Sequence, residues 1–191
     1  MLKVIVTGAF STGKSSLVEA LALELTDIGL AVVRIPDVAR TCRLPLNEAQ
    51  TDATSLWLLT TQVAREIEAQ AGPELVMLCD RGVPDILAHH RDNRPAAHGR
   101  WLEAMGAFPK KWIATYDVVL FSRIDDNKSI AADGLRSEDP AYRKRLDGHA
   151  AEILAHRAGI VTLAHDFSER LRQAREAIAL ALSRSRTSAT L

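Results

Sequence analysis

The feature that most constrains this chain is a stretch of small residues near its start. An apolar run, residues 2–6, is followed by the loop GAFSTGKS, residues 8–15. In this loop four residues separate Gly8 from Gly13, and Lys14 and Ser15 come directly after the second glycine. This spacing is the phosphate-binding P-loop pattern, which requires a strand before the loop and a helix after it. Several backbone N–H groups converge at such a helix start, where the helix dipole adds positive potential. The loop therefore predicts a site for the phosphates of a nucleotide.

The side chains of this loop have distinct expected roles. Lys14 is expected to reach the β- and γ-phosphates, and Ser15 to offer its hydroxyl to Mg²⁺. A chance match before an ordinary helix is disfavoured, because an apolar strand precedes the loop and a helical pattern follows it. We expect ATP and Mg²⁺ as cofactors; the loop itself leaves the choice between ATP and another nucleoside triphosphate open. The loop residues expected to bind the nucleotide are Gly8, Ser11, Thr12, Gly13, Lys14, Ser15 and Ser16.

Short apolar runs alternate with longer helical patterns along the rest of the chain. Strands that are apolar at consecutive positions are buried on both faces, and helices between them supply the crossovers of a parallel sheet. We therefore predict an α/β fold with a doubly wound, five-stranded parallel sheet. Its ligands should lie beyond the carboxyl ends of the strands. We expect one domain over residues 1–183 and a disordered tail, 184–191. The expected strands are 4–6, 31–35, 75–79, 118–122 and 160–163.

Helix starts and buried stripes are also readable from the chain. Asp139 followed by Pro140 predicts one helix start, and Asp166 with Glu169 predicts the start of the last helix. A long helix is expected over roughly 47–71 and two shorter ones within 83–114. The stripes expected to face the core are Leu17, Leu21, Leu25 and Ile28 in the first helix, Leu56, Val63 and Ile67 in the long helix, and Leu171, Ala174, Ile178 and Leu182 in the last helix.

An acidic residue follows the third expected strand directly. Asp80 is expected to bind Mg²⁺, either directly or through water, and Arg81 to neutralise phosphate charge. The alternative, an ordinary aspartate in a turn with Gly82, is less favoured because a P-loop is present. Asp85 lies one helical turn further on. It is open between a carboxylate of the site, beside the metal or the substrate, and the cap of a helix.

A second acidic residue follows the second expected strand. Asp37 is placed to accept a proton from a hydroxyl group and to orient it, as a kinase requires. Arg40, three residues later, is placed to hold a phosphate or carboxylate of the substrate. The alternative is a loop aspartate that caps a short turn, with Arg40 as its surface partner. Spacing alone does not separate these two interpretations.

The polar segment 124–145 is expected to form a helical lid. Arg136 and Arg143 lie seven residues apart, so they share a face if both are helical. Arginine charge closing over the γ-phosphate would stabilise the transferred group and exclude water. The alternative is a solvated helix face whose arginines pair with nearby carboxylates.

Composition narrows the classes of partner. Lys plus Arg and Asp plus Glu number 24 each, so net charge gives no reason to expect nucleic acid or an acidic membrane. The two cysteines, Cys42 and Cys79, form no paired motif that would suggest a disulfide framework or a zinc site. No apolar run is long enough to span a membrane and no signal-peptide pattern is present. We expect a cytoplasmic protein with a small-molecule substrate, and a homodimer is compatible with these features.

Four segments together give the chain a family resemblance. They are residues 8–15, "PDVAR" (36–40), "DRG" with "PD" (80–85) and "DGLRSEDPAYRKR" (133–145). With them, the chain resembles the P-loop kinase superfamily over most of residues 1–165. More narrowly, it resembles the AAA-type ATPase group related to nicotinamide riboside kinase, and more distantly the deoxynucleoside kinases and thymidylate kinase. The resemblance implies a nucleotide kinase-like P-loop NTPase fold with a lid.

The resemblance also implies roles for single residues. Asp37 matches the base that acts on a sugar hydroxyl, and Asp80 with Arg81 matches the acid–arginine pair after the third strand. Arg123 matches an arginine that lies against adenine. Gln62 lies on the helix that walls the acceptor pocket, where a glutamine reads a base or an amide; a surface glutamine is the alternative.

The resemblance leaves the phosphate acceptor open. Deoxynucleoside kinases have Glu where this chain has Asp37 and Asp80, and the lid and base-binding signatures of thymidylate kinase are not evident. We expect a MgATP-dependent kinase that acts on a hydroxyl or phosphate of a nucleoside- or nucleotide-like small molecule. The alternative is an ATPase or nucleotide-dependent switch that acts on a protein partner.

Overall fold

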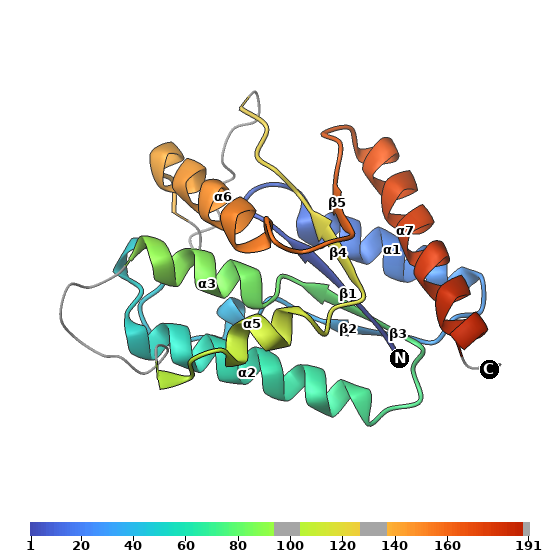
Figure 1. Ribbon diagram of the computed structural model, residues 1–191. Coiled ribbons are helices and arrows are strands. Elements are labelled where there is room, and N and C mark those ends of the chain that lie inside the picture. Colours follow the sequence, from blue (N-terminus) through green and yellow to red (C-terminus); the bar gives the residue numbers. More distant parts are fainter. Residues whose placement is uncertain (94–103, 127–136, 189–191) are drawn as a thin grey trace.

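The computed structural model describes residues 1–93, 104–126 and 137–188 (Figure 1). Within these residues, five strands form one parallel sheet in the order β2-β3-β1-β4-β5, which confirms the predicted α/β fold. The first strand of the chain therefore lies at the centre of the sheet, between β3 and β4. The strands are β1 (Leu2–Thr7), β2 (Val32–Ile35), β3 (Val76–Asp80), β4 (Val118–Phe121) and β5 (Ile160–Thr162).

Helices cover both faces of this sheet. In Figure 1, α1 and α7 lie on one side of the strands, and α2, α3, α5 and α6 lie on the other. Two short 3₁₀ turns, Val38–Thr41 and Asn47–Ala49, precede α2. The described helices are α1 (Lys14–Asp27), α2 (Asp52–Gln70), α3 (Val83–Asp92), α5 (Phe108–Ile113), α6 (Pro140–Leu154) and α7 (Phe167–Ser188).

Successive residues of the central strands pack into two separate cores. Ile5 of β1 belongs to the core under α2, α3 and α6, whereas its neighbours Val4 and Val6 belong to the core under α1 and α7. The side chains of a strand point alternately to opposite faces, so a strand buried on both faces must be apolar at every position. This is why continuous apolar runs predicted the three central strands, β1, β3 and β4, whereas the edge strands β2 and β5 are only partly buried.

The helix starts follow the expected capping chemistry. The Asp139 carboxylate accepts a hydrogen bond from the backbone N–H of Ala141 at 2.8 Å, directly before α6. The Asp166 carboxylate accepts one from Glu169 at 2.9 Å, at the start of α7. Each bond satisfies an N–H group that has no partner within the helix. The capping residues of both helices were therefore readable from the sequence.

The last helix extends further than the sequence indicated. α7 continues to Ser188, into the segment 184–191 for which we expected a disordered tail. The hydroxyls of Ser183 and Ser185 donate to the carbonyls of Leu180 and Ala181, one turn earlier. Both serines lie inside the helix, so the composition of this segment was a poor guide to where the helix ends.

Two residues of the expected buried stripes are exposed. Ile28 is 73% exposed because it lies just beyond the end of α1, and Ile67 of α2 is 53% exposed. The face of α2 that meets the core instead carries Leu59, Gln62 and Glu66. Polar residues thus occupy part of the buried face, which a search for apolar periodicity does not detect.

A network of polar side chains is buried around Glu66. The Lys3 ammonium lies 2.9 Å from one Glu66 carboxylate oxygen, and that carboxylate is fully buried. Trp112 Nε1 donates to the same carboxylate at 2.8 Å, and the Tyr116 hydroxyl donates at 2.8 Å. Gln62 Nε2 donates to it at 2.9 Å. The network therefore joins the start of β1 to α2 and to the segment around α5.

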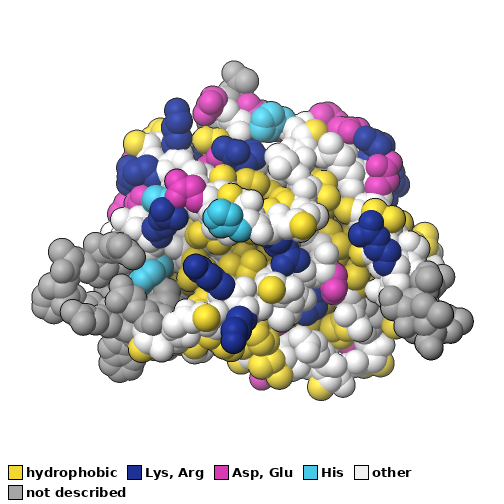
Figure 2. All heavy atoms as spheres, viewed as in Figure 1, with side chains coloured by type: hydrophobic (Ala, Val, Ile, Leu, Met, Phe, Trp, Pro, Cys, Tyr) yellow, Lys and Arg dark blue, Asp and Glu magenta, His cyan; other side chains and the backbone are white. Residues whose placement is uncertain are grey.

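The face of the molecule that is viewed in Figure 1 carries charges of both signs on its surface. Figure 2 shows acidic and basic side chains interspersed along the upper part of this face, with hydrophobic side chains between them nearer its centre. Among the helices of the described residues, none is long and apolar enough to cross a membrane.

The buried ion pair generates a prediction about stability. Lys3→Met should lower the free energy of unfolding by about 3–5 kcal/mol, because it leaves the Glu66 charge buried without its cation. Urea denaturation followed by circular dichroism measures this. As a control, Arg172→Met breaks an exposed pair with Glu169 and should leave the free energy of unfolding nearly unchanged, because water screens exposed charges. Equal small losses for both variants would contradict the account of the network.

Candidate nucleotide-binding site

The P-loop joins the central strand to the first helix. β1 ends at Thr7, and α1 begins at Lys14 with Gly13 in the left-handed conformation before it. Gly8 has φ of 134°, and a Cβ atom there would lie 2.2 Å from the backbone oxygen of Ser122, just after β4. Only glycine fits between the loop and the neighbouring strand. The sheet therefore fixes where the loop turns.

The loop encloses a pocket of polar character. Of the loop residues expected to bind a nucleotide, Gly8 shapes the turn and the rest line this pocket. Three residues from the ends of β2 and β3 complete its wall. We call this space the phosphate pocket; its lining residues are Ser11, Thr12, Gly13, Lys14, Ser15, Ser16, Asp37, Asp80 and Arg81.

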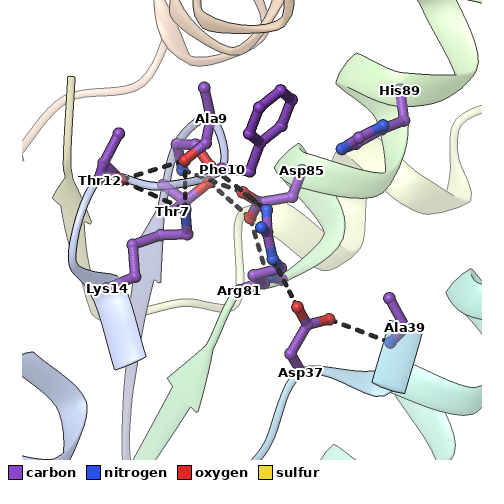
Figure 3. Close-up of polar contacts among 12 residues, drawn as sticks. Thr7, Ala9, Phe10, Thr12, Lys14, Asp37, Ala39, Arg81, Asp85 and His89 are labelled. Atoms are coloured by element: carbon purple, nitrogen blue, oxygen red, sulfur yellow. Dashed lines mark hydrogen bonds and ion pairs between the residues drawn. The ribbon is translucent and has the colours of Figure 1, made fainter. Parts of the chain in front are cut away.

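Lys14 lies folded back within this pocket. Its ammonium donates to the carbonyl of Ala9 and, at 3.3 Å, to the hydroxyl of Thr12 (Figure 3). Burial, and after it the positive charge of Arg81, lowers the pKa of Lys14 to about 7. The side chain contacts polar atoms of the loop rather than the apolar core, so it is placed to meet a phosphate.

Ser15 and Asp80 offer oxygen atoms on one side of the phosphate pocket. The Ser15 hydroxyl donates to Asp80 Oδ2 at 2.6 Å, across the boundary between α1 and β3. A hydroxyl and a carboxylate next to a triphosphate fit Mg²⁺, which usually takes one or two carboxylates together with phosphate oxygens and water. These two residues would hold the ion, and it would neutralise phosphate charge.

Arg81 lies between the P-loop and the end of β2, as Figure 3 shows. Its Nε donates to Asp37 Oδ2 at 2.7 Å, and its Nη1 lies 3.4 Å from both Asp85 Oδ1 and the Gly8 carbonyl. Burial alone would favour the neutral form, but Asp37, then Asp85 and Asp80, outweigh it and raise the pKa of Arg81. Arg81 also has φ of 78°, a conformation rare for residues with a side chain and most often kept at functional sites.

Asp37 lies directly across from Arg81. Its other oxygen accepts from the N–H of Ala39 at 3.0 Å, so it also begins the 3₁₀ turn that follows. Burial would raise the pKa of Asp37, but the Arg81 charge and the Ala39 bond outweigh burial and lower it. Asp37 is therefore a carboxylate at neutral pH.

Asp85 acts as a structural link in this structure. Its carboxylate accepts hydrogen bonds from the Thr7 hydroxyl at 2.7 Å and from the N–H groups of Gly8 and Gly82, each at 3.0 Å. It thus joins the start of the P-loop to the start of α3. The sequence left Asp85 open between these roles, and the geometry gives it the capping contact in addition to a place beside Arg81.

A second, more apolar pocket adjoins the phosphate pocket. Asp37 and Arg81 line both, which places the two pockets side by side. We call the second space the acceptor pocket. Its apolar lining is Phe10, Val38, Ala39, Leu46, Leu58 and Ile86, and its polar lining is Asp37, Arg40, Asn47, Gln50, Gln62, Arg81, Asp85 and His89, with Gly82.

Two polar residues of the acceptor pocket are fixed by buried partners. Gln62 is only 1% exposed, and its side-chain NH₂ group donates a hydrogen bond to the Glu66 carboxylate. Because the amide oxygen of Gln62 can only accept hydrogen bonds, this contact fixes which end of the amide faces Glu66. His89 Nδ1 lies 2.7 Å from the Tyr142 hydroxyl. Burial, and after it the Arg81 charge, lowers the pKa of His89 to about 3, so the imidazole is neutral. The lining of the pocket therefore combines two neutral polar side chains, Gln62 and His89, with the charged Asp37–Arg81 pair.

The arginines expected from the lid and from β4 lie in different places. Arg136 falls outside the described residues. Arg123 pairs with Asp147 at 2.6 Å and is 44% exposed, beside a surface hollow that includes His165. Arg143 is buried and donates to the carbonyls of Phe10 and Ser11, each at 3.1 Å, on the outer side of the P-loop.

Sequence reasoning missed one buried arginine next to the loop. Arg170 of α7 donates to the Thr12 carbonyl at 2.7 Å and to the Ser122 hydroxyl at 2.7 Å. The two partners lie 158 and 48 positions away in the chain. No local pattern near Arg170 points to these contacts.

The lowered pKa of Lys14 predicts proton uptake. Negative charge from a bound triphosphate raises the pKa of a nearby lysine, so at about pH 8 most of one proton should be taken up with ATP. Calorimetric titrations in buffers of different ionisation enthalpy measure this number. Lys14→Arg, whose guanidinium is always protonated, should lack this uptake. The same proton number for both proteins would contradict the role given to Lys14.

Comparison with known families agrees with this geometry. A protein-family model described as an AAA domain matches residues 3–170, which include the P-loop, Asp37, Asp80 and the sheet. No curated protein sequence matches the chain. The match covers most of the chain and includes the nucleotide-binding P-loop described above. The protein therefore belongs to the AAA domain family and carries a P-loop NTPase-like nucleotide-binding domain.

Proposed function

We propose that the protein is a MgATP-dependent phosphotransferase that moves the γ-phosphate to a hydroxyl or phosphate group of a small molecule. The observation that carries the proposal is the shared wall of the two pockets. Asp37 and Arg81 line both the phosphate pocket and the acceptor pocket. A molecule in the acceptor pocket would thus meet the terminal phosphate at these two residues. Such proximity is a major source of catalysis in phosphoryl transfer.

The residues at this boundary have chemistry that suits transfer. The Asp37 carboxylate would accept the proton of an acceptor hydroxyl as its oxygen forms the new bond to phosphorus. The bond between the γ-phosphorus and the β–γ bridging oxygen would break, and ADP would leave. Arg81 and Lys14 would stabilise negative charge on the transferred group and on the leaving oxygen.

The walls of the acceptor pocket favour an organic acceptor. Phe10, Leu58 and Ile86 form apolar surfaces, and Gln62 and His89 place neutral polar groups beside them. Small-molecule sites typically combine apolar walls with a few polar groups that fix the orientation of the ligand. A hydrolase needs only water beside the γ-phosphate, so this lining favours transfer over the alternative of an ATPase or switch that acts on a protein partner.

The proposal predicts turnover that depends on an acceptor. ADP release should rise steeply when a suitable member of a panel of nucleosides, nucleotides and vitamins is added to the protein with MgATP. Asp37→Asn should lower this stimulated rate by about 100-fold or more, because it removes the proton acceptor. A coupled assay for ADP measures the rate, and titration calorimetry checks that ATP still binds.

Asp27→Asn is the matched control, since Asp27 is an exposed residue at the end of α1. It should leave the stimulated rate unchanged. ADP release that no acceptor increases, and that Asp37→Asn leaves at the wild-type rate, would contradict the proposal and favour the hydrolase alternative.

A further inference from the structure

Three consecutive carbonyl groups of the P-loop are held from outside by arginines. Arg143 of α6 donates to the carbonyls of Phe10 and Ser11, each at 3.1 Å. Arg170 of α7 donates to the carbonyl of Thr12 at 2.7 Å. The two guanidinium groups come from helices on opposite faces of the sheet. Together they contact the loop where it turns around the phosphate pocket.

Peptide geometry converts these contacts into an arrangement of N–H groups. In a trans peptide the carbonyl of one residue and the N–H of the next point in opposite directions, and none of the described peptides is cis. Carbonyls of Phe10, Ser11 and Thr12 that point outward therefore turn the N–H groups of residues 11–13 the other way. Residues 11–13 line the phosphate pocket. The arginines thus fix the donors that a triphosphate would use.

The Arg170 contact is built into the fold rather than lying on its surface. Arg170 is 5% exposed, and its second amino group donates to the Ser122 hydroxyl, which itself donates to the Thr12 carbonyl at 3.1 Å. A Cβ atom on Gly13 would lie 2.9 Å from this guanidinium. The glycine before α1 thus leaves room for Arg170 as well as adopting the left-handed turn.

We propose that Arg143 and Arg170 are positioning residues for the triphosphate. They hold the loop carbonyls outward so that the N–H groups of residues 11–13 face the phosphates before a nucleotide arrives. Arg170 also brings a buried positive charge close to the loop. Nucleotide affinity therefore depends on α6 and α7, although neither helix belongs to the P-loop motif. This inference rests on the triphosphate-binding half of the proposed function and not on transfer to an acceptor.

The test measures binding of phosphates by variants of these arginines. Arg170→Met should weaken the binding of MgATP and of inorganic tripolyphosphate by at least about tenfold each. The reason is that the N–H groups of residues 11–13 would no longer be held toward the charged phosphate oxygens. Arg170→Lys should recover part of this affinity, since an ammonium can reach one carbonyl. Titration calorimetry at a temperature where thermal unfolding shows each variant folded gives both constants.

Each arginine has a matched control on its own helix. Arg172→Met on α7 removes an exposed arginine that pairs with Glu169 and Glu176, and should change both affinities less than about twofold. Arg145→Met on α6 removes an exposed arginine that pairs with Asp92. It should leave binding unchanged, whereas Arg143→Met should weaken it at least about fivefold.

A purely structural role predicts a different pattern. In that case Arg170→Met would lower the melting temperature of the free protein and leave both affinities at the wild-type value, which would overturn the inference. If Arg170→Met does not fold, Ser122→Ala decides: it removes one support of the Thr12 carbonyl and should weaken tripolyphosphate about threefold. Unchanged binding by Ser122→Ala would then overturn it.

This experiment separates the inference from the proposed transfer reaction. A wild-type protein that binds ATP with the expected arginine dependence, but transfers phosphate to no acceptor, would refute the kinase and leave the positioning role standing. A wild-type protein that binds neither MgATP nor tripolyphosphate would overturn both.

Discussion

The structure depends on the parallel pairing of β1 with its two neighbours. Val6 is paired with Asp80 on one side, and Thr7 with Phe121 on the other. The carboxyl ends of three strands therefore meet at one edge of the sheet, as in other α/β folds that bind ligands there. The turn at Gly8, the Asp80–Arg81 pair and Ser122 become neighbours only because of this register. A shift of one residue would separate the P-loop from the carboxylate that faces it.

Buried charges concentrate at this edge and are balanced by close contacts. Lys14 and Arg81 lie among Asp37, Asp80 and Asp85, and Arg81 contacts two of these carboxylates directly. Charges removed from water are tolerated only when they are paired and hydrogen-bonded. The strained backbone of Arg81 fits this environment, because the ion pairs hold the side chain where the two pockets meet. A negatively charged ligand would enter a site in which positive groups are already oriented.

The sequence predicted those parts of the molecule that depend on local patterns. Continuous apolar runs located the five strands, the P-loop spacing located the first strand–helix turn, and Asp139 and Asp166 located two helix starts. Long-range polar contacts gave no such signal. Arg170 reaches a carbonyl 158 positions away, and Lys3 reaches Thr115 across 112 positions. Gln62 and Glu66 lie on the core side of α2, where apolar periodicity led us to place Ile67 instead.

The central claim is that a triphosphate bound by the P-loop directs its terminal phosphate toward Asp37 and the acceptor pocket. A crystal structure with a non-hydrolysable ATP analogue and Mg²⁺ tests this most directly. We predict phosphates over the N–H groups of residues 11–15, with the Lys14 ammonium moved from the Ala9 carbonyl to the terminal phosphate. The γ-phosphate should face Asp37 and Arg81. Phosphates bound elsewhere, or a γ-phosphate turned away from the acceptor pocket, would contradict the account.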